Sequence, residues 1–377
     1  MNIMFASHTY MGGPFVVGSH HLAREMEKLG HAVLHVSTPI TPFHLLKLSN
    51  PDYRERFRIL TGRSKNASPR LINSVPLSWF TWKMAGPIFQ RTGKNWMVPS
   101  VKQLLRKNGM EQVDILFIDQ PSFVGLEKLV KPKVTVYRPT DLYSKLTGNP
   151  SIAAAEAAIL ADAQALVSTS SPVLEELQGY NPQIPTLLLE NGVEFEHFAS
   201  CADEPEELRN IPHPRATYVG ALDERLDREA LLRLAQEQPE TSVVIIGPHT
   251  PEDEAYFSGC SNAYLLGAKP YARMPDFLHH SDLALLPLSD HSANRGRSPM
   301  KLYEYAAAGL PVVVTETPEL LRRQEDFLHF YRDSGDFPGK VRQALALQQD
   351  KERVRSLARS HAWDAKATRL LDFVSSL

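Results

Sequence analysis

Short, almost wholly apolar runs alternate along the chain with longer stretches in which apolar residues recur every three or four positions. The short runs are typical of parallel strands buried on both faces, and the longer stretches are typical of amphipathic helices. In the first half, the pattern predicts strands over residues 2–7, 31–38, 114–119, 133–138, 165–170 and 186–190. In the second half, it predicts strands over residues 216–220, 242–247, 263–267, 282–287 and 311–315.

Helical stretches separate these strands. Between the first two strands, Leu22, Ala23 and Met26 fall on one helical face, and Gly30 ends the predicted helix. Further helices are predicted over residues 228–237, 271–280 and 300–308. Alternation of this kind implies two doubly wound α/β halves, each a parallel sheet with helices on both sides. The pattern breaks near residues 194–214, which we interpret as the joint between the two halves.

The composition fits this organisation. A length of 377 residues suits two domains, and contents of 43% hydrophobic and 22% charged residues exclude a disordered or fibrous chain. Cys201 and Cys260 form no Cys-x-x-Cys pair, which argues against a zinc site or redox dithiol and favours a reducing compartment. No apolar stretch is long enough to predict a spanning helix, and residues 1–6 are typical of a strand rather than a signal peptide. We therefore expect a cytoplasmic protein.

Charge is distributed unevenly, although the net charge is only -2. Residues 52–107 carry twelve basic and two acidic residues, a local charge of +10, together with three of the four tryptophans. One interpretation is a solvated basic face over core aromatics. The other is a surface that contacts anionic lipid headgroups, with indole rings at the interface. Nucleic acid is disfavoured as a partner because no recognisable nucleic-acid module accompanies the charge.

The strongest chemical signal lies in residues 298–311. Pro299 is tolerated in the first turn of a helix, where backbone N–H groups and the helix dipole favour an anion. Lys301 adds a charge in that turn, and Glu304 lies one turn further on the same side. Such an arrangement suits a nucleotide diphosphate, with the phosphates at the helix start and the ribose hydroxyls on the carboxylate. The alternative is an ordinary surface Lys–Glu pair on an alanine-rich helix.

This segment resembles the nucleotide-sugar signature of GT-B glycosyltransferases, and other parts of the chain occur in the order that this fold requires. They are residues 12–13, 29–33, 191–193, 218–222, 245–247, 266–287 and 363–364. The resemblance implies a GT-B architecture, in which two doubly wound Rossmann-like domains face each other across a cleft. The N-terminal acceptor-binding domain is expected over residues 1–198 and the C-terminal donor-binding domain over residues 199–360. A C-terminal helix over residues 361–377 is expected to return to the first domain.

The charge pattern and the resemblance together give a set of candidate site residues. Those expected to bind the donor are Gly220, Leu222, Gly247, Leu266, Gly267, Arg295, Arg297, Pro299, Met300, Lys301 and Glu304. Those expected in an acceptor or phosphate loop are His8, Gly12 and Gly13. The two glycines also have a simpler interpretation, a tight turn between strand and helix. Their spacing does not match the G-x-G-x-x-G fingerprint, which disfavours a nicotinamide dehydrogenase.

A closer resemblance is to the xanthan-type membrane-associated glucuronosyltransferases. It lies in Ser7-His8 after the first strand and in the run Tyr137-Arg138-Pro139-Thr140-Asp141. The resemblance implies that Asp141 is the catalytic base, and its position after a strand fits a base that deprotonates an acceptor hydroxyl. Two alternatives remain, namely that Asp141 caps the following helix and that Asp119, also at a strand end, is the base.

Two absences shape the expected chemistry. Retaining relatives carry two glutamates eight positions apart, and the partner position of Glu304 is Gly296, which favours inversion. The chain contains no Asp-x-Asp motif, and its histidines show no ligand pattern, so we expect no metal and no cofactor beyond the nucleotide-sugar co-substrate.

The sequence therefore predicts a glycosyltransferase that uses a nucleotide sugar, expected to be uridine-linked, and a lipid-linked or membrane-proximal glycan acceptor in cell-surface polysaccharide assembly. We expect it at the cytoplasmic face of an anionic membrane, with a retaining mechanism as the first alternative. A nucleotide-sugar 2-epimerase and a non-catalytic sugar-nucleotide binder are further alternatives.

Overall fold

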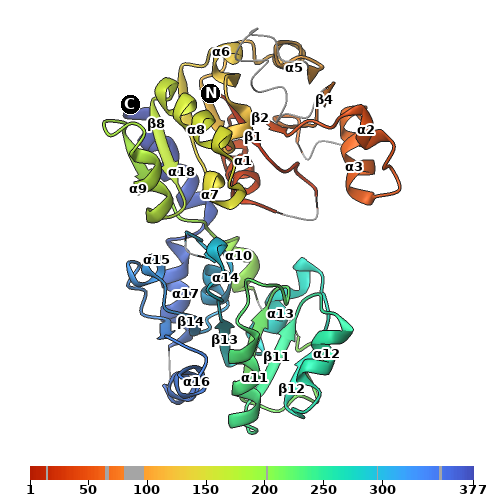
Figure 1. The fold of residues 1–377 in the computed structure, drawn as a ribbon, viewed down its shortest axis with the longest axis vertical. Helices are drawn as coiled ribbons and strands as arrows, with labels where there is room; N and C mark the ends of the chain where they lie inside the picture. The colour runs from red at the N-terminus through yellow and green to blue at the C-terminus, as the bar shows by residue number, and fades with distance from the viewer. Residues whose placement is uncertain (14–15, 64–67, 80–96, 201–202, 295, 348–349) are drawn as a thin grey trace. The chain divides into compact units, whose positions relative to one another are not determined.

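The computed structural model describes residues 1–13, 16–63, 68–79, 97–200, 203–294, 296–347 and 350–377 (Figure 1). The chain divides into two compact units. The first comprises Met1–Glu190 and Lys366–Leu377, and the second comprises Asn191–Ala365. The chain thus crosses between units earlier than the sequence boundary at residue 198, and it returns to the first unit a few residues after the expected position.

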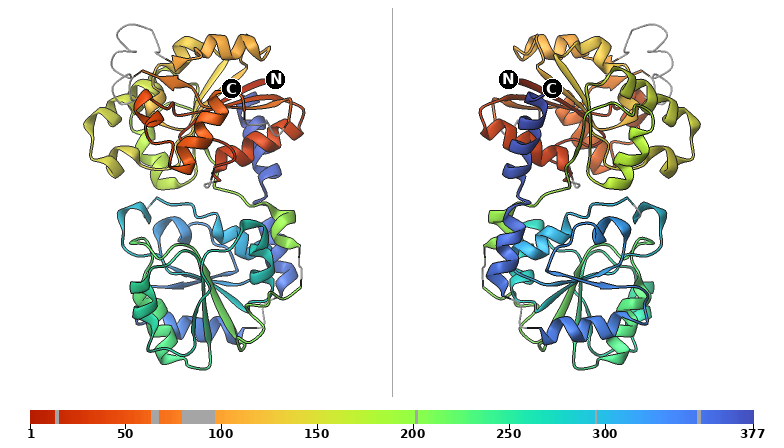
Figure 2. Two further views of the ribbon diagram at one scale, coloured as in Figure 1. Left: turned by 90° about the vertical axis from the view of Figure 1, so that its right-hand side faces the viewer. Right: turned by 90° about the vertical axis from the view of Figure 1, so that its left-hand side faces the viewer.

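The first unit is built on a parallel sheet with helices on both faces (Figure 2). In the described residues its strands run in the order β3-β2-β1-β6-β7-β8-β9. Their bounds are β1 Asn2–Ser7, β2 Ala32–Ser37, β3 Leu71–Ser74, β6 Ile115–Ile118, β7 Val134–Tyr137, β8 Ala165–Ser168 and β9 Thr186–Leu188. In the central strand, Ile3 aligns with Val33 of β2 on one side and with Ile115 of β6 on the other. Residues 3–7 of β1 are all buried because both faces of the sheet are covered.

The first unit also contains nine α-helices in the described residues. They are α1 Gly18–Lys28, α2 Pro42–Leu45, α3 Pro51–Leu60, α5 Val101–Lys107, α6 Leu126–Val130, α7 Tyr143–Thr147, α8 Pro150–Asp162, α9 Ser171–Gln178 and α18 Trp363–Ser375. Of these helices, α1, α5, α6, α8 and α9 bury apolar side chains. A small antiparallel pair, β4 Leu77–Ser78 and β5 Met97–Val98, lies outside the main sheet. The C-terminal helix α18 is tied to the first unit by Lys366, whose buried ammonium lies 2.8 Å from Glu190.

The second unit repeats the architecture. Its parallel sheet has the order β12-β11-β10-β13-β14-β15. The strands are β10 Arg215–Val219, β11 Ser242–Ile246, β12 Ala263–Leu265, β13 Leu283–Leu286, β14 Val312–Thr315 and β15 Leu328–Tyr331. The helices are α10 Phe195–Ala199, α11 Arg228–Glu237, α12 Pro251–Phe257, α13 Met274–His279, α14 Lys301–Ala307, α15 Pro318–Leu321, α16 Phe337–Ala346 and α17 Lys351–Arg359. Two apolar cores, one on each face of the sheet, hold these helices in place.

The strand order determines where a ligand binds in such sheets. In both units the chain winds outward from a central strand, then crosses back to its other side, so the order reverses between β1 and β6 and between β10 and β13. Ligands of doubly wound sheets bind beyond the carboxyl ends of the strands at this reversal. The structure confirms the predicted α/β class, and it directs attention to the residues that follow these four strands.

Several elements differ from the sequence prediction. The sequence pattern does not predict β3, β4, β5 and β15. Strands β4 and β5 have only two residues each, and polar residues interrupt the apolar run in β3 and β15. The single helix expected over residues 271–280 is a 3-10 turn, Tyr271–Arg273, followed by α13. Among the described residues, no helix combines the length and the apolar character that crossing a membrane requires.

Candidate functional site

In the first unit, the ends of β6 and β7 are joined by a buried ion pair. Asp119 follows β6 and Arg138 follows β7, and the Arg138 Nε and Nη2 atoms each lie 2.9 Å from one carboxylate oxygen. Both side chains are only 3% exposed. Because both Asp119 oxygens accept from the guanidinium, this carboxylate holds two strands together rather than facing a substrate.

Asp141 occupies a different environment, three residues beyond Arg138. It is partly exposed, and its Oδ2 atom accepts a hydrogen bond of 2.8 Å from the Thr140 hydroxyl. The capping interpretation is wrong, because helix α7 has Leu142 at its N-cap and no side-chain cap. Asp141 therefore carries a carboxylate that the local helix does not use.

His8 lies at the end of β1, near both carboxylates. Burial lowers the pKa of its imidazole, while the charges of Asp119 and Asp141 oppose this shift and Arg138 adds to it. The Nδ1 atom is buried and has no hydrogen-bond partner. Burial thus disfavours the charged imidazole, and one ring nitrogen has no partner among the described residues.

The loop after β1 has the conformation and packing of a tight turn, and its role in binding acceptor or phosphate stays a prediction. Gly12 has a φ of +87°, a conformation that favours glycine. A Cβ atom at Gly13 would lie 3.0 Å from the ring of Tyr10. The Tyr10 ring also carries the Arg56 guanidinium of α3 at 4.7 Å, so close packing accounts for the second glycine.

In the second unit, cations gather around the start of α14. Burial lowers the pKa of the Lys301 ammonium. Glu304 opposes this shift, and the positive charges of Arg297 and Arg225 add to it. The acid beside them, Asp223, is engaged by Arg225, whose Nε atom lies 3.0 Å from Oδ1. Three cations and one already paired carboxylate therefore share a small region at the end of β10.

Helix α14 is shorter than the sequence predicts. It begins at Lys301, with Met300 as its N-cap and Pro299 before it, and ends at Ala307. A helix of about two turns has few aligned peptide dipoles, so the side-chain cations contribute more to the positive potential than the helix itself. Arg295, the other cation expected here, lies outside the described residues.

Glu304 lies one turn along α14 from Lys301. Burial raises the pKa of its carboxyl, Lys301 opposes the shift, and the nearby charge of Glu194 adds to it while His197 opposes it. Glu194 also accepts a hydrogen bond of 2.7 Å from the Tyr271 hydroxyl. Glu304, Glu194 and Tyr271 thus form a polar group next to the cations at the start of α14.

The predicted glycines serve close packing of strand ends. A Cβ atom at Gly247 would overlap the carbonyl oxygen of Gly220, and one at Gly220 would overlap the Tyr218 hydroxyl. Gly267 has a φ of +71°, and its carbonyl accepts from the Gly247 N–H at 3.1 Å. Leu222 and Leu266 are half-buried against the two cores of the second unit.

Helix α14 is also fixed to the central strand. The Val219 N–H at the end of β10 donates to the buried Tyr305 hydroxyl at 2.9 Å. The loop before α14 is fixed by Asn294, whose amide donates to the carbonyl oxygens of Arg225 and Ser289, each at 2.9 Å. These contacts bring the Arg225 loop and the α14 loop together. Arg225, Asp223 and Glu194 were missed by sequence reasoning, since nothing local distinguishes them from surface charges.

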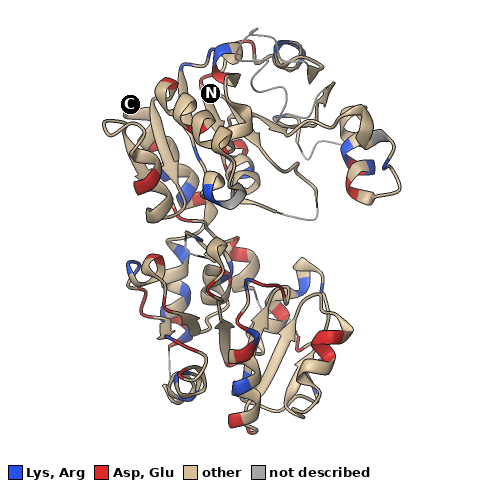
Figure 3. Ribbon diagram, viewed as in Figure 1, with Lys and Arg blue, Asp and Glu red and all other residues tan. Residues whose placement is uncertain are grey.

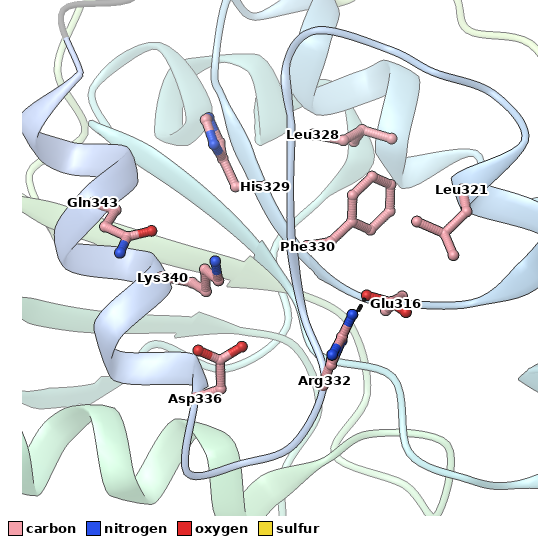
Figure 4. Close-up of a pocket in the computed structure, with 9 residues that line it drawn as sticks. All are labelled: Glu316, Leu321, Leu328, His329, Phe330, Arg332, Asp336, Lys340 and Gln343. Carbon is pink, nitrogen blue, oxygen red and sulfur yellow. Dashed lines mark hydrogen bonds and ion pairs between the residues drawn. The ribbon is translucent and has the colours of Figure 1, made fainter.

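A surface pocket of about 530 Å³ lies elsewhere on the second unit, at the edge strand β15 (Figure 4). Its lining residues are Glu316, Leu321, Leu328, His329, Phe330, Arg332, Asp336, Lys340 and Gln343. None of them belongs to the predicted site. Within the described residues, no group of three or more histidine, cysteine or acidic side chains is placed to hold a metal ion, and metal-independent chemistry stays a prediction.

The family model and the curated relative that this chain matches are both described as glycosyltransferases. Residues 225–372 match a family model described as glycosyl transferase-like. The putative teichuronic acid biosynthesis glycosyltransferase TuaH of Bacillus subtilis (strain 168) is 25% identical over 198 residues, and the match spans 49% of each chain. This chain therefore matches about half the length of that relative.

Solved structures match along the whole chain. The HepE protein of Anabaena, in complex with UDP and glucose, is 13% identical and superposes with a TM-score of 0.68 over 100% of both chains. Sucrose-phosphate synthase from Thermosynechococcus elongatus is 16% identical, with a TM-score of 0.67 over 99% of this chain and 98% of that one. These likenesses show the fold, and the chain has the GT-B fold that its motifs predict.

The buried pair predicts a specific cost in stability. Asp119→Ala leaves the Arg138 guanidinium buried without its partner, so we expect the free energy of unfolding to fall by about 3–5 kcal/mol. Thermal and denaturant unfolding measure this loss. The matched control is Asp162→Ala, which removes the exposed pair with Lys128 and is expected to cost at most about 1 kcal/mol. Equal losses in the two variants would contradict a structural role for Asp119.

Proposed function

We propose that this GT-B chain is a glycosyltransferase that moves a sugar from a nucleotide-sugar donor, expected to be a UDP-sugar, to an acceptor hydroxyl. The observation that carries the proposal is the group formed by Lys301, Arg297 and Arg225 beside the paired Asp223. It lies at the strand reversal of the second unit, where doubly wound sheets bind nucleotides. The names of the relatives support the same class.

The charges suit a diphosphate better than a neutral ligand. A nucleotide diphosphate leaves with additional negative charge, and cations held in a partly dry environment stabilise that charge without reorganising. Lys301 supplies a point charge, while an arginine supplies a planar fork that matches phosphate oxygens. Glu304, one turn away, is the expected acceptor for the ribose hydroxyls.

For the transfer itself, we assign the role of base to Asp141. Its carboxylate takes the proton of the acceptor hydroxyl while that oxygen bonds to the anomeric carbon. The bond from that carbon to the diphosphate oxygen breaks at the same time, and the nucleotide diphosphate leaves with the electron pair. The acceptor oxygen attacks from the face opposite the leaving group, so the product has inverted configuration. Asp119 is unsuited to this role because Arg138 occupies both of its oxygens.

The first unit offers a surface for a lipid-linked or membrane-proximal acceptor. Phe43, Leu46 and Trp79 are 74%, 85% and 59% exposed, an unusual cost for large apolar side chains in water. They flank one another: α2 packs on α3, and the backbone pairing of Ser78 with Ile40 brings the segment before Trp79 beside the segment before α2. We call Phe43, Leu46 and Trp79 the apolar edge.

Basic residues accompany the apolar edge. Arg54 and Arg58 of α3 and Lys47 after α2 are exposed. Figure 3 shows basic and acidic positions together on the ribbon of α3. Arg56 is paired with Asp52 at 3.0 Å and is largely buried, whereas Arg58 is exposed although it lies 3.4 Å from Glu55. Apolar side chains beside exposed cations favour an anionic lipid surface, so we propose peripheral attachment to the cytoplasmic face of a membrane. Lys83 and Arg91, part of the same basic segment, lie outside the described residues.

The donor role of Lys301 is tested by calorimetry with UDP. Lys301→Met keeps the length of the side chain but removes its charge, so we expect UDP affinity to fall about 10- to 100-fold. The matched control is Lys340→Met, which removes a lysine from the pocket at β15 in the same unit. This variant is expected to leave UDP affinity unchanged. Weaker binding in the control alone would place the nucleotide at β15 and refute the proposed donor site.

The role of Asp141 is tested by turnover and product configuration. Asp141→Asn keeps the shape but removes the proton acceptor, so we expect kcat to fall by a factor of about 10² to 10⁴ with UDP affinity unchanged. NMR of the wild-type product is expected to show an inverted anomeric carbon. A near-normal rate would move the base to another residue, and retained configuration would identify a retaining enzyme. Epimerised donor, or no transfer to any acceptor, would favour an isomerase or a binding protein.

Membrane attachment is tested by co-sedimentation with vesicles. The double variant Phe43→Ser with Leu46→Ser is expected to release the protein from vesicles containing phosphatidylglycerol, since about 25 cal/mol per Å² of apolar burial is lost. The control is Leu347→Ser, another leucine that is more than half exposed but lies on the second unit. High salt is expected to weaken binding as well. Equal binding of all three proteins would leave only a solvated basic face.

A further inference from the structure

Asn191 is the first residue of the second unit, directly after the chain leaves the first. It makes two hydrogen bonds to one distant residue. Its backbone N–H donates to the Ser298 hydroxyl at 3.1 Å, and its side-chain amide donates to the Ser298 carbonyl oxygen at 2.8 Å. Ser298 is buried, and the turn that starts α14 follows it. A connecting residue is thus bonded to the segment that presents Lys301.

The segment around Asn191 is held on its other side as well. The Val193 N–H donates to the His361 carbonyl oxygen at 3.0 Å, and the Trp363 N–H donates to the Val193 carbonyl oxygen at 3.1 Å. A Cβ atom at Gly192 would lie 2.6 Å from that His361 oxygen. The outgoing and returning segments therefore run side by side in close contact within the second unit.

The returning segment is attached to the same helix. The His361 ring stacks on Tyr303 of α14, with ring centres 4.0 Å apart and planes 14° apart. Its Nε2 atom lies 2.9 Å from Glu325. Helix α14 and its first turn consequently anchor both segments through which the chain passes between the units.

We propose that Asn191 is a positioning residue for donor binding. By holding Ser298 from both its hydroxyl and its carbonyl, Asn191 fixes the direction in which the chain enters α14, and with it the place of Lys301. This inference rests on the proposed function, because it takes the cationic group as the diphosphate site. It also makes donor affinity depend on the conformation of the connecting segment.

The physical reason lies in the shape of the turn. Without the Asn191 amide, the buried Ser298 carbonyl loses its donor, and the turn gains conformations in which Lys301 points elsewhere. A site that is correctly formed for only part of the time binds its ligand more weakly by that fraction. Once the donor is bound, the base and the acceptor are unaffected, so the loss appears in donor affinity rather than in the saturated rate.

The test compares UDP affinity and donor KM in Asn191 variants of the full chain. Asn191→Ala is expected to weaken UDP binding, measured by calorimetry, about three- to tenfold, and to raise KM for the UDP-sugar by the same factor with little change in kcat. Asn191→Asp has the same shape but cannot donate to the carbonyl. It is therefore also expected to weaken UDP binding and raise KM with little change in kcat. The control is Asn181→Ala, which removes a similar amide-to-carbonyl bond, to Leu160, in the first unit.

A second pair of variants separates positioning from folding. Ser298→Ala removes the hydroxyl that accepts the Asn191 N–H, whereas Ser298→Thr retains a hydroxyl and is expected to restore UDP affinity. Combining Asn191→Ala with Ser298→Ala is expected to weaken binding by less than the product of the two single effects, since the two bonds hold the same turn. Wild-type UDP affinity in soluble Asn191→Asp and Ser298→Ala proteins would overturn the inference. Absence of UDP binding by the wild-type chain would overturn the proposed function instead.

Discussion

Parallel strands bring all their carboxyl ends to one edge of a sheet, and a reversal in strand order leaves two neighbouring ends between which no crossover helix passes. This constraint decides where chemistry can occur in both units. In the first unit, His8 and Asp119 follow the two strands at the reversal. In the second unit, Gly220 follows β10, and the loop that leaves β13 ends where α14 begins.

The two units use charge differently at these equivalent positions. In the first, Arg138 and Asp119 form a buried ion pair, and Asp141, the proposed base, is partly exposed nearby in the sequence. In the second, the cations Lys301, Arg297 and Arg225 lie together with two acids, Asp223, which pairs with Arg225, and Glu304, which acts on Lys301. The proposed base and the proposed diphosphate site therefore lie in surroundings of different charge.

Much of the fold could be predicted because buried parallel strands are apolar on both faces and leave a clear local pattern. That signal fails for β15, where His329 interrupts the run, and for β3, where Asn73 does. The placement of Lys301 and Glu304 one turn apart could be predicted from their spacing on one helix. The contact of Asn191 with Ser298 could not, because the two residues lie 107 positions apart. Only the alternative interpretation of Asp141, a helix cap, is wrong, because its carboxylate contacts Thr140 instead.

The contact between Gly247 and Gly220 bears on attempts to redirect the enzyme. Any side chain at Gly247 collides with backbone that cannot retreat, since Gly220 is itself enclosed by Tyr218. Directed evolution of nucleotide or sugar preference therefore has no freedom at these two positions. The loop carrying Asp223 and Arg225 does have such freedom, because its residues are partly exposed and bear side chains that meet the same region. Libraries built there alter the ligand surface while leaving the strand ends, and hence the fold, intact.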